Sequence, residues 1–323
     1  MSFDACTQVS PDCPVSASTN GYAPNFGGNL FFAIVFGLCL ILQFILGIKY
    51  RTWTWWAAMV SGLVLELAGY IGRLLQHNNV WDANAFKLQL VTLILGPSFL
   101  SGSIDLTLKH IVIVFGKQYS HIKPALYTWL FVGLDFFSIM IQAAGGGLAS
   151  GATSDGKNDV QQLNTGNHMI LAGIAIQVLQ LVLFGIVTAD YVRRLWQAKK
   201  RGGETLSKEA QAYLADWKFR GFCAAIIIGY FGILIRCIYR LPEMADGWGN
   251  GLQRNEPSFL VLDGGMVAMA SIVLTAFHPG YSFIQLSNGY RKRAAREAHE
   301  DREKVAGAPD TLASSSRSTS WNP

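Results

Sequence analysis

The segment SGLVLELAGYIGRLL, residues 61–75, is apolar enough to lie in a membrane, yet it carries a carboxylate, Glu66, and a guanidinium, Arg73. Seven residues separate the two, so on a helix they share a face about 10.5 Å apart along the axis. Neither group can neutralise the other at that distance. Because an ionisable side chain near the centre of a bilayer costs at least about 2.5–3.5 kcal/mol, we expect each to face the protein interior and to find a partner on another helix.

The rest of the chain also has the composition of a membrane protein, with 51% hydrophobic and only 15% charged residues among 323. The net charge of +5 could indicate nucleic-acid binding, but the basic residues lie in short segments between apolar runs, where the positive-inside rule accounts for them. We therefore expect no nucleic-acid partner. The sequence has no GxxxxGK[ST] or HExxH motif, and its five cysteines lack metal-ligand spacing, so we expect no metal, no cofactor and no enzymatic activity.

Apolar runs long enough to cross about 30 Å of hydrocarbon predict an all-α, polytopic protein with seven transmembrane helices. The predicted spans are residues 30–48, 53–75, 88–115, 124–148, 168–190, 218–241 and 258–277. Pro97, directly after Gly96, is a candidate kink in the third span.

Basic residues follow the first, third, fifth and seventh spans, which indicates an extracellular N-terminus and a cytoplasmic C-terminus. The chain then divides into an extracellular tail (1–28), a transmembrane domain (29–285) and a basic, then disordered, cytoplasmic tail (286–323). Within the domain, residues 202–217 have the spacing of a cytoplasmic amphipathic helix. Cys6 and Cys13 are candidates for a disulfide if the first tail is extracellular.

Polar residues inside the spans gather on particular helical faces. Asp135 and Gln142 share one face of the fourth span, and Arg236, Arg240 and Glu243 line the sixth. The full set concentrates toward the extracellular side and comprises Glu66, Arg73, Asp135, Gln142, His168, Arg236, Arg240, Glu243 and Asp263. This pattern predicts a water-accessible cavity that opens outward, although ion pairs between helices can also be purely architectural.

Specific partners follow from these positions. We expect Glu66 to pair with Arg236 or Arg240, and we expect Arg73 to pair with Glu243, Glu256 or Asp263. Asp105 and Lys109 lie four residues apart in the third span, which favours a local ion pair between them.

Several blocks of sequence resemble the fungal lipid-translocating exporter family of the aminocholesterol-resistance type. They are ELAGYIGR (66–73), LGPSFLSGSI (95–104), LDFFSIMIQAAGGGL (134–148), GNHMILAGIAIQ (166–177) and IRCIYRLPEMADGWGNGLQRNEPSFLVLDG (235–264). The resemblance implies a seven-span protein, most often of the plasma membrane, that moves or exports amphipathic lipids and is linked to resistance to toxic amphiphiles. It also adds Gln177 to the candidate ligand-binding residues named above.

The leading hypothesis is therefore translocation or export of an amphipathic lipid such as a sphingoid long-chain base. Glu66, Asp135 and Asp263 would hold a cationic amine, while the arginines would position the acids or a phosphate. Membrane lipids or amphipathic small molecules are the expected partners, and the sequence identifies no cytoplasmic partner. One alternative is a seven-helix lipid-sensing receptor or regulator without transport activity. A membrane-embedded hydrolase is a third possibility, since serine, aspartate and histidine occur in the spans.

Overall fold

The computed structural model describes residues 6–18, 21–120, 126, 128–152, 160–200, 208–245, 251 and 254–283. Within these ranges the regular secondary structure is helical, apart from one isolated β-bridge between Ser10 and Cys13, and short turns and irregular segments join the helices. The α-helices are α1 (Phe26–Tyr50), α2 (Trp53–Asn78), α3 (Ala83–Phe115), α5 (Gly133–Ala152), α6 (Val160–Lys200), α7 (Lys208–Ala215), α8 (Trp217–Ala245), α9 (Glu256–Phe259), α10 (Met266–Ala276) and α11 (Pro279–Ser282). A π-helical turn, Thr128–Val132, leads into α5, and another, Leu260–Gly265, joins α9 to α10.

The prediction of seven membrane-spanning helices is confirmed. The described residues contain seven helical stretches that are long and apolar enough to cross a bilayer, so the chain is a multi-pass membrane protein. They are Phe26–Tyr50, Trp53–Asn78, Ala83–Phe115, Trp129–Ala149, Gln161–Ala198, Trp217–Ala245 and Glu256–Ser282.

The fifth span is longer than its apolar run predicts. Beyond that run, the helix is supported by ion pairs of Asp190 with Arg193 and Arg194, three and four residues further on. Of the predicted amphipathic helix at 202–217, residues 208–215 form α7, and residues 201–207 lie outside the described residues.

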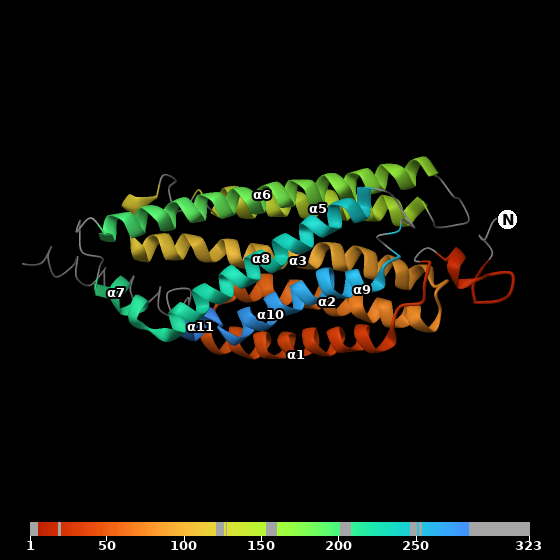
Figure 1. Cartoon of the computed structure of the whole chain (residues 1–323), viewed down its shortest axis with the longest axis horizontal. Helices are drawn as coiled ribbons and strands as arrows, with labels where there is room; N and C mark the ends of the chain where they lie inside the picture. Colours follow the sequence, from red (N-terminus) through yellow and green to blue (C-terminus); the bar gives the residue numbers. More distant parts are fainter. Residues whose placement is uncertain are drawn as a thin grey trace, which may run out of the picture.

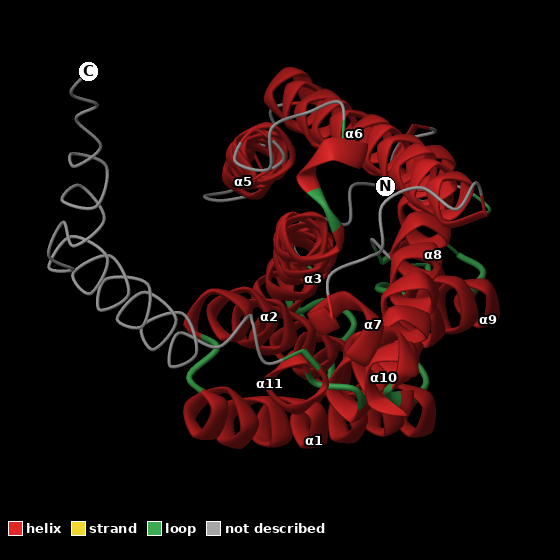
Figure 2. Ribbon diagram, turned by 90° about the vertical axis from the view of Figure 1, so that its left-hand side faces the viewer, coloured by secondary structure: helices red, strands yellow, loops and turns green. Residues whose placement is uncertain are grey.

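The long helices run side by side, and α3 lies at the centre of the bundle (Figures 1 and 2). In α3, 72% of the most apolar window is buried inside the protein, the highest share among the seven spans. Helices α5 and α6 pack together on one side of α3, while α2 and then α1 lie on another (Figure 2). Helix α9 and the described N-terminal segment lie at one end of the bundle, called here the α9 end, and α7 and α11 lie at the opposite, α7 end (Figure 1).

Glycines allow α5 and α6 to approach each other closely. A β-carbon on Gly166 of α6 would lie 2.7 Å from the Gly145 carbonyl oxygen and the Ala149 nitrogen of α5. Small residues at such crossings let backbones pack directly, which drives helix association where no hydrophobic effect acts. The contact sets the spacing between two helices that carry polar residues of the candidate site.

Candidate functional site

The structure separates most of the predicted polar set into two clusters, and Glu66 and His168 lie outside both. The first, called here the arginine cluster, lies toward the α9 end and consists of Arg73, Arg236, Arg240, Glu243, Glu256 and Asp263. Its centre is Asp263, whose Oδ1 accepts hydrogen bonds from Arg236 Nε at 2.9 Å and from Arg240 Nε at 2.8 Å. Asp263 Oδ2 accepts a third bond from Arg240 Nη2 at 3.0 Å. Asp263 sits in the π-helical turn between α9 and α10, a local widening that is frequent at functional sites.

Arg236 also donates a hydrogen bond to a carbonyl group of α3 that lacks its usual helical donor. Pro97 has no N–H, so the carbonyl of Leu93, four residues earlier, loses its normal helical donor. Arg236 Nη2 donates a hydrogen bond to this Leu93 carbonyl. The helix continues through Pro97, and the freed carbonyl becomes an anchor for a buried guanidinium from α8.

Arg73 joins the other elements at the α9 end. Its Nη2 lies 3.1 Å from Glu256 Oε1, and its Nε donates to Asn29 Oδ1 at 2.6 Å. Pairing of Arg73 with Glu256 was one of three predicted alternatives and is confirmed. The other two acids are engaged by Arg240, which contacts Glu243 Oε2 at 3.0 Å in addition to Asp263.

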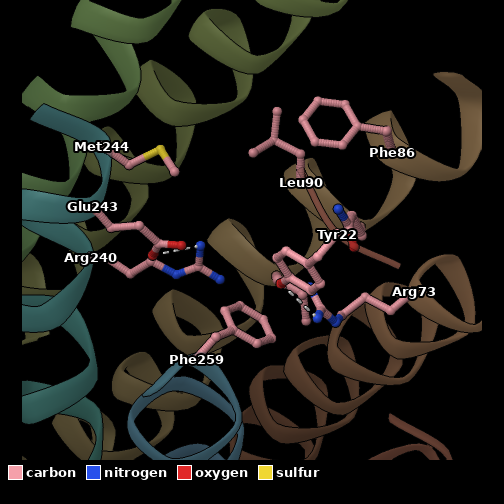
Figure 3. Close-up of a pocket in the computed structure, with 10 residues that line it drawn as sticks. Tyr22, Arg73, Phe86, Leu90, Arg240, Glu243, Met244 and Phe259 are labelled. Atoms are coloured by element: carbon pink, nitrogen blue, oxygen red, sulfur yellow. Dashed lines mark hydrogen bonds and ion pairs between the residues drawn. The ribbon is translucent and has the colours of Figure 1, made fainter. Parts of the chain in front are cut away.

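The ring of Phe259 lies between Arg73 and Arg240, with its centroid 4.2 Å and 5.1 Å from their guanidinium carbons (Figure 3). These residues border a cavity of about 30 Å³ that also contacts Tyr22, Phe86 and Met244 (Figure 3). This space has room for one or two water molecules and none for a lipid. The cavity at the arginine cluster is thus far smaller than a ligand, because ion pairs and aromatic rings fill most of the space. That it opens to the extracellular side stays a prediction.

Glu66 does not pair with Arg236 or Arg240, and this prediction was wrong. Both arginines direct their donors to Asp263 instead. No ion pair or hydrogen bond to the Glu66 side chain occurs among the described residues, and its Oε1 is buried without a partner. The carboxyl group lies against Gly96 of α3, where an added β-carbon would be 2.6 Å from Oε1.

The second group, called here the amide cluster, joins α3, α5 and α6. It consists of Ser98, Ser101 and Asp105 on α3, Asp135, Ser138 and Gln142 on α5, and Gln177 and Gln180 on α6. Gln177 Oε1 accepts from Ser98 Oγ at 2.9 Å and from Gln142 Nε2 at 3.1 Å. Gln142 also reaches Ser138 Oγ at 2.7 Å. Gln177, which was added to the candidate residues on the family resemblance alone, thus lies beside Gln142.

At the other end of the amide cluster, Asp105 and Asp135 face each other within hydrogen-bonding reach. Gln180 Nε2 donates to Asp105 Oδ2 at 2.5 Å, and Ser101 Oγ lies 3.4 Å from Asp135 Oδ2. No ion pair joins Asp105 to Lys109 within the part of the chain that the structure describes, so the predicted local pair was wrong. Asp105 points inward to α5 and α6, where tertiary contacts replace the local one.

Sequence reasoning did not assign Asp105, Gln180, Ser98 or Ser101 to the site. A signal was present, since positions 98, 101 and 105 recur at three- and four-residue intervals and so share one face of α3. His168, in contrast, is exposed on α6 and belongs to neither cluster. The predicted disulfide between Cys6 and Cys13 is present.

A larger apolar groove of about 570 Å³ lies between α6 and α8, nearer the α7 end. Its lining includes Phe184, Val192, Trp196, Ile227 and Phe231. Several of these side chains are exposed on the outside of the bundle, where membrane lipid would surround them. None of the candidate polar residues contributes to it.

Comparison with known proteins adds an independent finding. The sequence pattern described as RTA1-like protein matches residues 59–285. The sphingoid long-chain base transporter RSB1 of Saccharomyces cerevisiae is 31% identical over 300 residues, which cover 84% of this chain and 77% of that protein. The probable lipid transporter atnI of Emericella nidulans is 24% identical over 84% of this chain and 73% of its own length. Protoporphyrin uptake protein 1 of Saccharomyces cerevisiae is 30% identical over 69% of this chain and 67% of its own length. No solved structure matches significantly.

Proposed function

This chain belongs to the RTA1-like protein family, and we propose that it transports an amphipathic lipid that carries a basic amine, such as a sphingoid long-chain base. The lipid would move between leaflets or out of the cell, and such export would protect against toxic amphiphiles. The names of the relatives support a lipid as cargo, and no chemical step is needed for this role.

The charges of the arginine cluster support the choice of a basic amine. Its three arginines are matched by three acids, each of which lies within 3.1 Å of a guanidinium nitrogen. The cluster is thus balanced without Glu66, which nevertheless interacts electrostatically with Arg236, Arg240 and Asp263. Addition of an ionised Glu66 leaves one negative charge in excess, which a single ammonium group would neutralise.

The observation that carries this proposal is the unpartnered Glu66 carboxyl. Its side chain is 1% exposed, and its Oε1 has no hydrogen-bond partner. A buried carboxylate without a cation or donor is costly, so such a group in a membrane helix marks a functional site by default. Asp263, by comparison, already accepts three hydrogen bonds from arginines, and Asp135 faces Asp105. Of the three acids expected to hold an amine, Glu66 is therefore the one whose carboxyl group is still available to pair with a cation.

The described conformation would be a closed state of the transporter. The cavity of about 30 Å³ beside Arg240 has no room for a lipid headgroup. Entry of the amine would require the Phe259 ring and the Arg73–Glu256 pair to separate, which would open the α9 end. This step would expose Glu66 while the Asp263 pairs hold α8 and α10 together.

We further propose that the protein lies in the plasma membrane with its N-terminus outside and its C-terminus in the cytoplasm. The Cys6–Cys13 disulfide supports this orientation, since such bonds persist in oxidising compartments and are rare in the cytosol. The arginine cluster would then lie on the extracellular side.

Reconstitution tests the proposal. Purified protein in liposomes should move a fluorescent long-chain base across the bilayer faster than protein-free liposomes do. The Glu66→Gln variant should lose most of this flux, because a neutral amide cannot pair with an ammonium group. An Asp190→Asn variant is the matched control, since Asp190 forms a partly exposed ion pair with Arg194 away from the site. Saturable binding of the long-chain base without any flux would contradict transport and indicate a lipid sensor.

A further inference from the structure

The amide cluster contains two carboxyl groups that share one buried contact. Asp105 of α3 and Asp135 of α5 are each 2% exposed, and their carboxyl groups lie within hydrogen-bonding reach of each other. An ionised carboxylate only accepts hydrogen bonds, so a hydrogen bond between the two groups requires a proton on one of them. Two buried carboxyl groups this close are far more stable with one shared proton than with two negative charges.

No basic side chain compensates the pair among the described residues. The interactions of Asp105 and Asp135 are with each other, with Gln180 of α6 and with Ser101 of α3. The titratable groups that face them from α8 are Tyr230, near Asp105, and Cys237, near Asp135, and neither is a cation. From α2, Glu66 interacts with the arginine cluster instead.

The surrounding acceptors are also unfilled. Asp105 Oδ1, Asp135 Oδ1, Gln142 Oε1 and Gln180 Oε1 are all buried without a hydrogen-bond partner. Buried acceptors in this number are unusual, because each costs free energy when no donor reaches it. A bound proton would supply a donor to one of these oxygens, and water molecules would supply donors to the others.

Helix α3 contacts both the carboxyl pair and Glu66, but through opposite faces. Asp105, Ser101 and Ser98 face α5 and α6, whereas Gly96, against which the Glu66 carboxyl of α2 lies, is on the other side of the helix. From Asp105 to Gly96 the helix rises by about 13.5 Å. A movement of α3 relative to α5 would therefore also change its contact with Glu66.

We propose that Asp105 and Asp135 form a proton-binding site that couples lipid movement to a proton gradient. This inference rests on the proposed transport function. With the proton bound, the hydrogen bond between the carboxyl groups holds α3 against α5. When the proton leaves to water, two like charges face each other in a medium of low polarity, and their repulsion separates the helices. Rebinding of a proton restores the closed contact.

Infrared spectroscopy of the purified protein tests the proton directly. The spectrum of the wild-type protein in nanodiscs should contain a band from protonated carboxylic acid that decreases in the double variant Asp105→Asn/Asp135→Asn, because this variant removes both carboxyl groups and the proton that they share. The double variant is needed because, in a single variant, the remaining aspartate can keep the proton. The Asp190→Asn variant is the control and should leave this band unchanged, since Asp190 is ion-paired with Arg194. If the double variant loses only carboxylate absorption, the shared proton is refuted.

Liposomes with an imposed pH gradient test the coupling. A gradient of one pH unit should drive up to about tenfold accumulation of labelled long-chain base per proton, because one unit corresponds to about 1.36 kcal/mol. In the single variants Asp105→Asn and Asp135→Asn, accumulation should disappear, while Asp190→Asn should behave as the wild type does. If the flux of long-chain base through the wild-type protein does not change with the pH gradient, or changes with a sodium gradient instead, proton coupling is refuted and the transport function is still supported. Absence of any wild-type flux would refute the transport function itself, and the infrared result would still decide whether the proton is present.

Discussion

Replacement of Asp263 by asparagine should destabilise the protein strongly. The carboxylate accepts three hydrogen bonds, at 2.8, 2.9 and 3.0 Å, from two guanidinium groups whose side chains are at most 5% exposed. Asparagine keeps one acceptor, removes the charge and turns an amide donor toward guanidinium donors. Loss of one partner of a buried ion pair costs about 3–5 kcal/mol, because the other charge remains buried without compensation.

The measurement is the free energy of unfolding in detergent micelles for a set of variants. Asp190→Asn is the comparison, since the side chains of its pairs with Arg193 and Arg194 are at least 33% exposed and each pair should be worth at most about 1 kcal/mol. The double variant Asp263→Asn/Arg240→Gln should lose less stability than the two single variants together, since removal of one guanidinium relieves the excess charge. An Asp263→Asn cost no larger than that of Asp190→Asn, or strictly additive effects in the double variant, would contradict the proposed role of Asp263.

Three further predictions concern other parts of the molecule. Gly96→Ala should reduce lipid flux several-fold while the protein stays folded, because the added methyl group would lie 2.6 Å from Glu66 Oε1; Gly147→Ala, with open space at that position, should leave flux unchanged. Tyr230→Phe should lower the free energy of unfolding by about 1 kcal/mol, since it removes the hydrogen bond from Tyr230 Oη to the Leu181 carbonyl at 3.0 Å that joins α8 to α6, and an unchanged stability would contradict this role. On intact cells, a membrane-impermeant thiol reagent should label Cys6 and Cys13 only after reduction, and labelling that also needs permeabilised cells would place the N-terminus in the cytoplasm.

Much of the fold could be predicted because a bilayer demands long apolar helices, and the apolar runs reveal them directly. All seven spans were found, and the main difference concerned the fifth. Its helix continues through Asp190, Arg193 and Arg194, where polar composition ended the apolar run but ion pairs along the helix sustain it. Apolar content thus predicts where a helix can be buried and does not predict where it ends.

The partners inside the membrane were harder to predict. Helical spacing assigns a residue to a face, but the choice among several facing acids depends on side-chain reach and on local backbone geometry. Arg236 was expected to meet Glu66, yet the π-helical turn brings Asp263 closer, and Pro97 frees the Leu93 carbonyl as a second acceptor. Asp105 was expected to pair along its own helix with Lys109, but its carboxyl group is buried against α5 and α6, where it contacts Asp135 and Gln180 instead.

The size of the cavity could not be predicted from the sequence either. The concentration of charged residues toward one end of the bundle indicated a space among them. Whether that space is open depends on how rings and guanidinium groups pack, and Phe259 between Arg73 and Arg240 closes it. A sequence pattern therefore indicates which groups gather, while packing determines what can enter.

In the proposed transport cycle, the Glu66 carboxyl receives the amine of the transported lipid. The most direct measurement compares the flux of a labelled long-chain base with that of its N-acetylated analogue, which has the same chain and no positive charge, in wild-type and Glu66→Gln proteoliposomes. A charge-assisted hydrogen bond contributes about 1.5–3 kcal/mol, so the wild-type protein should favour the free base by about 10- to 100-fold. The Glu66→Gln variant should lose this preference. Equal transport of both lipids by the wild-type protein, or an unchanged preference in the variant, would contradict the claim.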